Sequence, residues 1–181
     1  MKLNPRQKLR VWLVGRRPCA SAARWARAKD LNLAQAWKLC HRADWMVWAM
    51  EEAGLFDPIK WRRFACGCAR MVWELLSERS RNAVEVAERF CDGLAPKEEL
   101  DAAWESAWFD PVAADEHDPV WSAAAVARAA AGLAVWSAAW VAGVAAKAGT
   151  SEKEKAALLR KIYGNPFARK KRAKAFSGGS Q

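Results

Sequence analysis

Cysteine and histidine are the residues of this sequence that could bind a metal ion or act as nucleophiles near neutral pH. The five cysteines and two histidines are Cys19, Cys40, Cys66, Cys68, Cys91, His41 and His117. Cys40-His41, Cys66-Gly67-Cys68 and Cys91 together offer the thiolate and imidazole ligands of a zinc site. Structural zinc sites place paired ligands on a turn, however, whereas Cys66 and Cys68 fall in a helical pattern and would point to different sides of one helix. The spacing therefore predicts no metal site.

Carboxylates form the second group with possible chemistry, in the segment 110–119 with sequence DPVAADEHDP. Four acidic residues beside His117 could bind a divalent cation, but they lack the regular ligand spacing of a calcium loop. We interpret this segment as a solvated connection. The sequence also contains no glycine-rich phosphate loop and no nucleophile motif. It therefore predicts a non-catalytic protein, with no catalytic residues and no cofactor.

Lysine and arginine are concentrated at the two ends of the chain. Residues 1–29 hold nine basic side chains and no acidic one, residues 169–174 hold five more, and the rest of the chain holds sixteen basic and twenty acidic residues. This segregation favours an anionic partner, and we predict that both ends contact nucleic-acid phosphates. The predicted contact residues are Arg6, Lys8, Arg10, Arg16, Arg17, Arg24, Arg27, Lys29, Arg169, Lys170, Lys171, Arg172 and Lys174.

Two tryptophans lie among the basic residues of the N-terminal segment, at Trp12 and Trp25. Exposed rings could stack on bases while guanidinium groups meet phosphates. The alternative is a pair of amphipathic helices, over residues 3–15 and 18–29, whose rings face inward. We expect the rings to face inward and the charges to face outward.

Helix-forming residues dominate and β-branched residues are sparse, so the sequence predicts an all-α fold. We expect a single-domain bundle of about six to seven helices, rich in alanine and in the twelve tryptophans of the sequence. One long helix is expected over residues 32–54, with Asn32 as its cap. The stretch 64–94 forms a helix pair at the centre of the bundle, and Ser77 caps its second helix. A Ser151-x-x-Glu154 capping box opens the last helix, through Tyr163.

The apolar segment 120–147 contains eighteen consecutive uncharged residues between Arg128 and Lys147. That length reaches the minimum for a membrane span. Alanine and glycine dominate it, however, and neither favours membrane insertion strongly. We therefore expect a helix in the core of the bundle and no membrane. The odd number of cysteines and the lack of a secretory signal predict a cytoplasmic protein with free thiols.

Charge divides the chain into three expected parts. Residues 1–30 form a basic helical arm, residues 31–167 form the helical bundle, and residues 168–181 form a basic tail. The sequence Gly164-Asn165-Pro166 ends the last helix, and Phe167 is expected to fold back onto the body.

Several motifs resemble a helical family of bacterial proteins that is abundant in planctomycetes. They are FACGCAR at 64–70, WELL at 73–76, ERSRNAVEVAERFCDG at 78–93 and LLRKIYGNPF at 158–167. The segment 37–46, WKLCHRADWM, is similar to a motif of immunity proteins from polymorphic-toxin systems. The resemblance covers about half of the chain and implies an all-α, non-catalytic protein that binds and blocks a toxin. The basic ends depart from the family pattern.

Two binding functions follow from the sequence. In the first, the helical body is a scaffold and the basic ends grip RNA or DNA, as an accessory subunit of a nucleoprotein or of a phage-defence assembly. In the second, the chain is an immunity-like protein that binds a protein toxin. The first rests on the charges of this chain and the second on the resemblance, and we favour the first.

Overall fold

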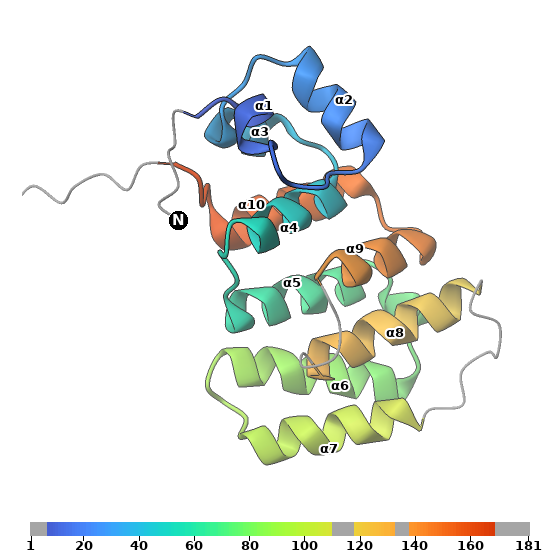
Figure 1. Cartoon of the computed structure of the whole chain (residues 1–181). Helices are drawn as coiled ribbons and strands as arrows, with labels where there is room; N and C mark the ends of the chain where they lie inside the picture. Colours follow the sequence, from blue (N-terminus) through green and yellow to red (C-terminus); the bar gives the residue numbers. More distant parts are fainter. Residues whose placement is uncertain (1–6, 110–117, 133–137, 169–181) are drawn as a thin grey trace, which may run out of the picture. The chain divides into compact units, whose positions relative to one another are not determined.

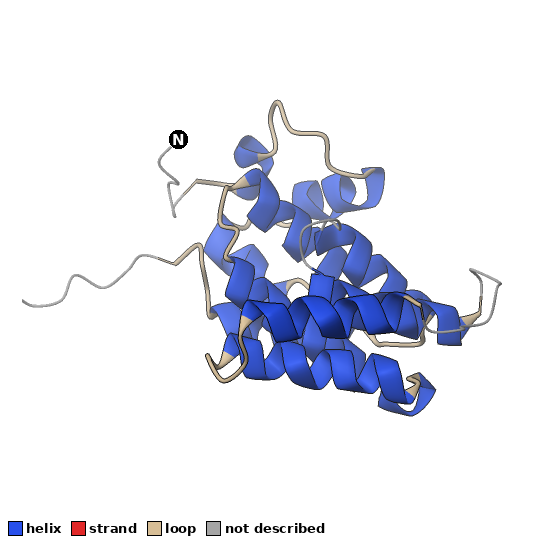
Figure 2. Ribbon diagram, turned by 90° about the horizontal axis from the view of Figure 1, so that it is seen from below, coloured by secondary structure: helices blue, strands red, loops and turns tan. Residues whose placement is uncertain are grey.

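The computed structural model describes residues 7–109, 118–132 and 138–168, and these residues are all-α (Figure 1). Figure 2 shows them as helices joined by loops, without a strand. The helices are α1 (Leu9–Trp12), α2 (Ala20–Ala28), α3 (Leu33–Leu39), α4 (Ala43–Glu52), α5 (Pro58–Arg70), the 3-10 helix η1 (Trp73–Leu75), α6 (Glu78–Cys91), α7 (Lys97–Trp108), α8 (Pro119–Gly132), α9 (Ala138–Lys147) and α10 (Glu152–Tyr163).

Contacts divide the chain into two compact units. Unit 1 contains the described residues 7–37 and 165–168, and unit 2 contains those of 38–164. The boundary between the units falls within α3. The division into an arm, a bundle and a tail rests on charge and stays a prediction.

The helix expected over residues 32–54 is divided in two, and that expectation was wrong. Helix α3 ends at Leu39 and α4 starts at Ala43. Two side chains of α10 bind the backbone at the break, because the Arg160 guanidinium donates to the Cys40 carbonyl and Glu152 accepts from the Ala43 N–H at 2.8 Å. These bonds satisfy the backbone groups that a helix end leaves without an intrahelical partner.

The N-terminal helix expected over residues 3–15 is also shorter, since α1 covers only Leu9–Trp12 and residues 1–6 lie outside the described chain. Lys8 is extended and forms an isolated bridge with Asn32. The Leu9 N–H therefore bonds the Leu31 carbonyl at 2.8 Å. This pairing starts the helix later than hydrophobic spacing alone suggests.

The expected central helix pair is present as α5 and α6. Asp57 caps α5 by accepting from the N–H groups of Ile59 and Lys60, and Ser77 caps α6 by accepting from Ser80 at 3.1 Å. Within unit 2, α6 lies beside α5 and α7, and α8 contacts all three (Figure 1). This arrangement gives the unit a continuous apolar interior.

Helix α8 is buried along most of its length, and its buried residues are mainly alanine. Nine of its residues are buried: Ser122, Ala123, Ala124, Ala125, Val126, Ala127, Ala129, Ala130 and Ala131. Small side chains let neighbouring helices approach closely, as Gly132 shows. A Cβ built on Gly132 would lie 2.2 Å from Nε1 of Trp104 on α7. The core position expected for this segment is confirmed for α8.

The apolar segment 120–147 is described as two helices, α8 and α9, with residues 133–137 outside the described chain. None of the described helices combines the length and the apolar character that a membrane crossing requires.

The cap expected at Ser151 was wrong, because its side chain makes no capping hydrogen bond to α10. The first-turn carboxylate that is engaged is Glu152 rather than Glu154. It binds the Ala43 N–H and the ammonium of Lys155. Asn32 does cap α3, and Gln35 completes a reciprocal pair of side-chain bonds with it, at 2.9 and 3.0 Å.

Candidate nucleic-acid interface

The basic residues predicted to contact phosphates fall into two groups. Seven of them belong to the described part of unit 1: Lys8, Arg10, Arg16, Arg17, Arg24, Arg27 and Lys29. The other six lie outside the described residues: Arg6, Arg169, Lys170, Lys171, Arg172 and Lys174. The interface is therefore argued from the first group.

Five of these seven side chains are exposed and make no hydrogen bond, ion pair or ring contact with the described residues: Arg10, Arg17, Arg24, Arg27 and Lys29. Arg24 and Arg27 are three residues apart on α2, so they share one face of that helix. Ala26 is the residue of α2 that is buried. Helix α2 thus presents cationic side chains away from the apolar interior of unit 1.

The remaining two predicted contact residues have partners inside unit 1. Lys8 forms an ion pair with Asp30 at 2.7 Å, and its hydrogen bond lowers the pKa of the Asp30 carboxyl group. Arg16 lies over the Trp12 ring, 4.3 Å from its centroid, and donates to the Trp12 carbonyl at 2.5 Å. The sequence did not reveal the partner of Lys8, because Asp30 lies one residue beyond the basic segment 1–29.

The arginines of unit 2 differ from those of unit 1. All nine of them make a hydrogen bond, an ion pair or a ring contact: Arg42, Arg62, Arg63, Arg70, Arg79, Arg81, Arg89, Arg128 and Arg160. Carboxylates partner five of the nine, for example Asp92 with Arg63 at 2.8 Å and Glu88 with Arg70 at 2.6 Å. Arginine charges are thus largely neutralised locally in unit 2, whereas several in unit 1 are left unpaired.

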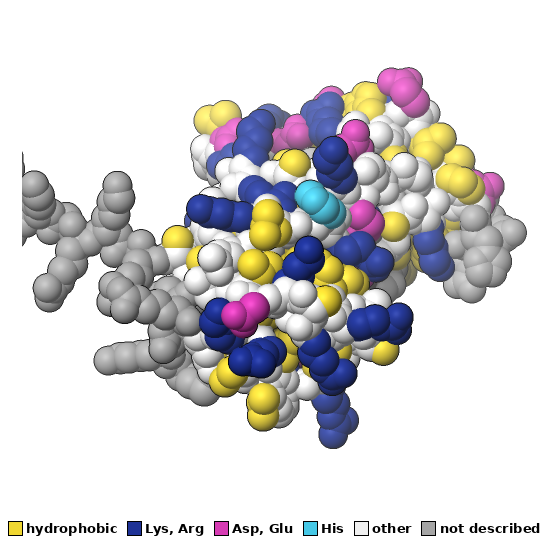
Figure 3. Space-filling model, turned by 90° about the horizontal axis from the view of Figure 1, so that it is seen from above, with side chains coloured by type: hydrophobic (Ala, Val, Ile, Leu, Met, Phe, Trp, Pro, Cys, Tyr) yellow, Lys and Arg dark blue, Asp and Glu magenta, His cyan; other side chains and the backbone are white. Residues whose placement is uncertain are grey.

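Net charge follows the same division. By sequence, residues 1–37 and 165–181 hold fourteen basic residues and one acidic residue, a net charge of +13, whereas residues 38–164 hold sixteen basic and nineteen acidic residues, a net charge of −3. Figure 3 shows a face of the molecule on which lysine and arginine side chains are numerous. A positive field of this kind attracts polyanions and raises their rate of association.

The segment that leads to the basic tail is fixed within unit 1. The Asn165 side-chain amide donates to the Ala34 carbonyl at 2.9 Å. Phe167 is buried, and its ring packs edge-on against Trp37 with centroids 5.7 Å apart. The prediction that Phe167 folds back is confirmed. Since residue 169 follows directly in the chain, the RKKRAK tail is tethered to the unit that carries the unpaired arginines.

Tryptophan rings contribute little exposed surface to unit 1. Trp12 and Trp37 are buried, with 1% and 3% of their surface exposed, and Trp25 is half-buried. The inward orientation expected for the rings is confirmed for Trp12. Base stacking on this ring is therefore excluded in the described conformation.

Burial makes three of the five cysteine side chains unsuited to act as nucleophiles or metal ligands. All five are free thiols, and Cys40, Cys66 and Cys68 are buried. Burial raises the pKa of the Cys68 thiol to about 12, so it carries no thiolate at neutral pH. Within the described ranges, no three His, Cys, Asp or Glu side chains come together in a way that could hold a metal ion.

Comparison with known proteins finds no family model, no curated protein and no solved structure that matches this chain. The resemblance to planctomycete helical proteins and to immunity proteins therefore stays a prediction. The function has to be argued from the residues described above.

Proposed function

We propose that this chain is a non-catalytic protein that binds nucleic acid through the phosphate backbone, using unit 1 as its contact surface. In this role it serves as an accessory subunit of a nucleoprotein or of a phage-defence assembly. The observation that carries the proposal is the set of exposed, unpaired cations of unit 1, in contrast to unit 2, in which every arginine has a partner.

Unpaired surface arginines are suited to phosphate binding for a physical reason. A guanidinium already held by a carboxylate must give up that partner to bind a phosphate, whereas an unpaired one gains a charge-assisted bond. Each phosphate neutralised also releases condensed counterions, which supplies most of the affinity at low salt. Arg17, Arg24 and Arg27 are the three arginines on or next to α2 that meet this condition.

The proposed recognition has little dependence on base sequence. Phosphate contacts position a protein without reading bases, and the buried Trp12 ring is not available for stacking. Both ends of the chain would add to the same interface, because the segment that precedes the tail is anchored to α3 of unit 1. We expect similar affinities for mixed sequences of equal length.

The test is a binding titration of the full chain with single- and double-stranded DNA and RNA of mixed sequence, at two or more salt concentrations. We expect submicromolar affinity at low salt that falls steeply as salt is added. No binding to any of the four nucleic acids at low salt would refute the proposal.

Two triple variants sharpen the test. Arg17→Gln, Arg24→Gln and Arg27→Gln together should reduce the slope of log K against log salt by about one unit for each phosphate that the variant no longer binds. The matched control carries Arg42→Gln, Arg63→Gln and Arg89→Gln, which remove the same charge from unit 2, where each arginine is paired. An equal decrease in the two variants would mean that only total charge matters and that unit 1 is not the site.

A truncation tests the tail separately. Removal of residues 169–181 should weaken binding further without unfolding the protein, because the anchoring residues Asn165 and Phe167 remain. The midpoint of thermal unfolding should stay the same. Unchanged affinity after truncation would exclude the tail from the interface.

A second candidate function is the binding of a protein toxin. It is favoured by exposed aromatic side chains at the end of α7, where Trp108 is 46% and Phe109 76% exposed. In the sequence these residues precede the acidic segment 110–119, of which residues 110–117 lie outside the described chain. Exposed aromatic side chains followed in the sequence by carboxylates suit a cationic protein partner. Replacing both aromatic residues by alanine should abolish toxin binding and leave nucleic-acid binding unchanged.

A further inference from the structure

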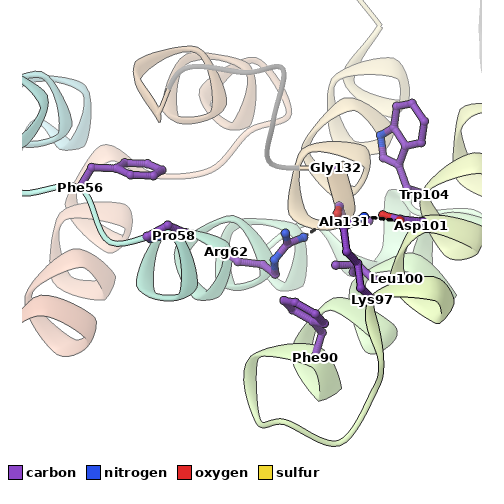
Figure 4. Close-up of a pocket in the computed structure, with 10 residues that line it drawn as sticks. All are labelled: Phe56, Pro58, Arg62, Phe90, Lys97, Leu100, Asp101, Trp104, Ala131 and Gly132. Carbon is purple, nitrogen blue, oxygen red and sulfur yellow. Dashed lines mark hydrogen bonds and ion pairs between the residues drawn. The ribbon is translucent and has the colours of Figure 1, made fainter.

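A cleft of about 460 Å³ lies in unit 2 among α5, α6, α7 and α8 (Figure 4). Its volume falls in the usual range for small-molecule sites, roughly 300 to 1,000 Å³. Apolar side chains line most of it, including Phe56, Phe90 and Leu100. The polar side chains that face it are few, and Arg62 is the most buried of them.

Arg62 is a buried cation without a carboxylate partner among the described residues. It is 7% exposed, and it reaches from α5 to the end of α8, where Nη1 donates to the carbonyls of Ala130 and Ala131 at 2.6 and 2.5 Å (Figure 4). The Phe90 ring centroid lies 5.1 Å from the guanidinium carbon. A helix end supplies only about half a negative charge, so these contacts compensate the cation incompletely.

The free part of this guanidinium is the edge formed by Nε and Nη2. Neither nitrogen makes a hydrogen bond to the described residues, and Nε is fully buried. Nη2 is the nitrogen of this edge that is left to meet a ligand, and a guanidinium N–H forms a strong charge-assisted hydrogen bond with a carboxylate. Desolvation lowers the pKa of Arg62, which agrees with a charge that lacks a full counter-ion.

A second donor without an acceptor lines the same cleft. The indole Nε1 of Trp104 is buried and makes no hydrogen bond to the described residues. At the rim, Lys97 forms an ion pair with Asp101, so this carboxylate is already engaged by a cation of its own helix. The cleft thus combines an apolar wall, a cation that is compensated only in part and a buried N–H donor without an acceptor among the described residues.

We propose that this cleft binds a small amphipathic carboxylate, with the anionic head on Nη2 of Arg62 and the apolar body against Phe56, Phe90 and Leu100. A cationic ligand would be repelled by Arg62. A neutral apolar ligand would leave the guanidinium as incompletely compensated as before. The site is independent of the nucleic-acid function proposed for unit 1.

The test compares three eight-carbon probes with the full-length protein by calorimetry: octanoate, 1-octanol and octyltrimethylammonium. Acetate serves as the head group alone. We expect octanoate to bind at least about tenfold more tightly than octanol, which is the usual gain from hydrogen bonds to a charged group. Acetate and the cation should not bind measurably. Equal or tighter binding of octanol, or no binding of octanoate at millimolar concentration, would overturn the proposal.

Variants locate the bound octanoate. Arg62→Gln should weaken octanoate binding by about tenfold or more and leave octanol binding little changed. Because Arg62 also binds the end of α8, this variant needs a check of its unfolding transition. Phe56→Ala removes a side chain that is 55% exposed, so it should fold normally, and it should weaken binding of octanoate by about threefold because the ligand buries less apolar surface.

Two control variants test whether octanoate binds in this cleft or elsewhere on the surface. Leu94→Ala removes a side chain that is 72% exposed and does not line the cleft, so it should not change octanoate affinity. The Arg17, Arg24 and Arg27 triple variant should also leave it unchanged. If that triple variant weakens octanoate binding and Phe56→Ala does not, octanoate binds unit 1 and the proposed site is wrong.

Discussion

The carboxylate of Glu152 accepts a hydrogen bond from the backbone N–H of Ala43 at 2.8 Å, across 109 residues of chain. The other oxygen of Glu152 lies 2.5 Å from the ammonium nitrogen of Lys155, whose side chain is fully buried. One carboxylate therefore binds the start of α4 and an ammonium group in the interior of unit 2. Loss of this carboxylate should therefore destabilise both the start of α4 and the buried ammonium group of Lys155.

Glu152→Gln should lower the free energy of unfolding by about 3 kcal/mol, because it removes a carboxylate partner of a buried charge. Chemical denaturation measures this change. The matched control is Glu154→Gln on the same first turn, where the side chain is exposed, and it should cost less than about 0.5 kcal/mol. Equal destabilisation in the two variants would contradict the proposed role of Glu152.

Gly132→Ala should destabilise the protein by about 1 to 3 kcal/mol, because the new Cβ would overlap the Trp104 indole and force it to move. Gly143→Ala provides the contrast. Apart from its chain neighbours and the backbone of its own helix, no atom of the described residues lies within 4 Å of a Cβ at Gly143, so alanine should stabilise α9 by up to about 1 kcal/mol. Thermal unfolding of both variants would check the opposite signs.

Ser77→Ala should cost about 1 kcal/mol of stability, because its hydroxyl caps α6 by accepting from the Ser80 N–H. Ser151→Ala should change stability by less than about 0.5 kcal/mol, because Ser151 makes no capping bond to α10. Sequence pattern alone would predict a cost at both positions. A decrease at Ser151 as large as that at Ser77 would mean that its hydroxyl caps α10 in solution.

Stability should fall with rising pH above about 9, because burial raises the pKa of the Cys68 thiol from 9.0 to about 12. In this window the unfolded thiol releases its proton while the folded one keeps it, so the unfolded state binds fewer protons. The slope is at most about −1.4 kcal/mol per pH unit for one thiol. The contribution is intact below about pH 9 and is lost as the pH rises toward 12.

Denaturation of the wild type and of Cys68→Ala from about pH 8 to about pH 11 measures this contribution. The Cys68→Ala variant should start from a lower stability, and its stability should fall less steeply with pH. Cys19→Ala is the control, because Cys19 is exposed. Parallel curves for wild type and Cys68→Ala would show that the buried thiol titrates normally.

The structure confirms the helical features whose determinants lie within a few residues of each other. The two predicted caps Asn32 and Ser77 accept hydrogen bonds from the backbone N–H groups of Gln35 and Ser80, each three residues ahead. Phe64 and Cys68, four residues apart and so on one face of the predicted helix, are likewise both buried. Such features depend on local geometry, which a sequence encodes directly.

The break between α3 and α4 could not be predicted, because its partners Arg160 and Glu152 lie more than a hundred residues away along the chain. Arg62 is a similar case. In the sequence it is one of many helical arginines, and only the packing of α5 against α8 buries it and gives its Nη1 two carbonyl partners. A long-range interaction of this kind leaves no local signal.

The sequence by itself determined the helical class and the placement of charge. Composition sets the helix propensity, and the positions of lysine and arginine along the chain are given by the sequence directly. Tertiary structure decided which cations remain unpaired. Folding brings Asp30 to Lys8, 22 residues away along the chain, while Arg17, Arg24 and Arg27 are left without a partner among the described residues. Pairing depends on distances of a few ångströms between segments, and only the folded chain establishes those distances.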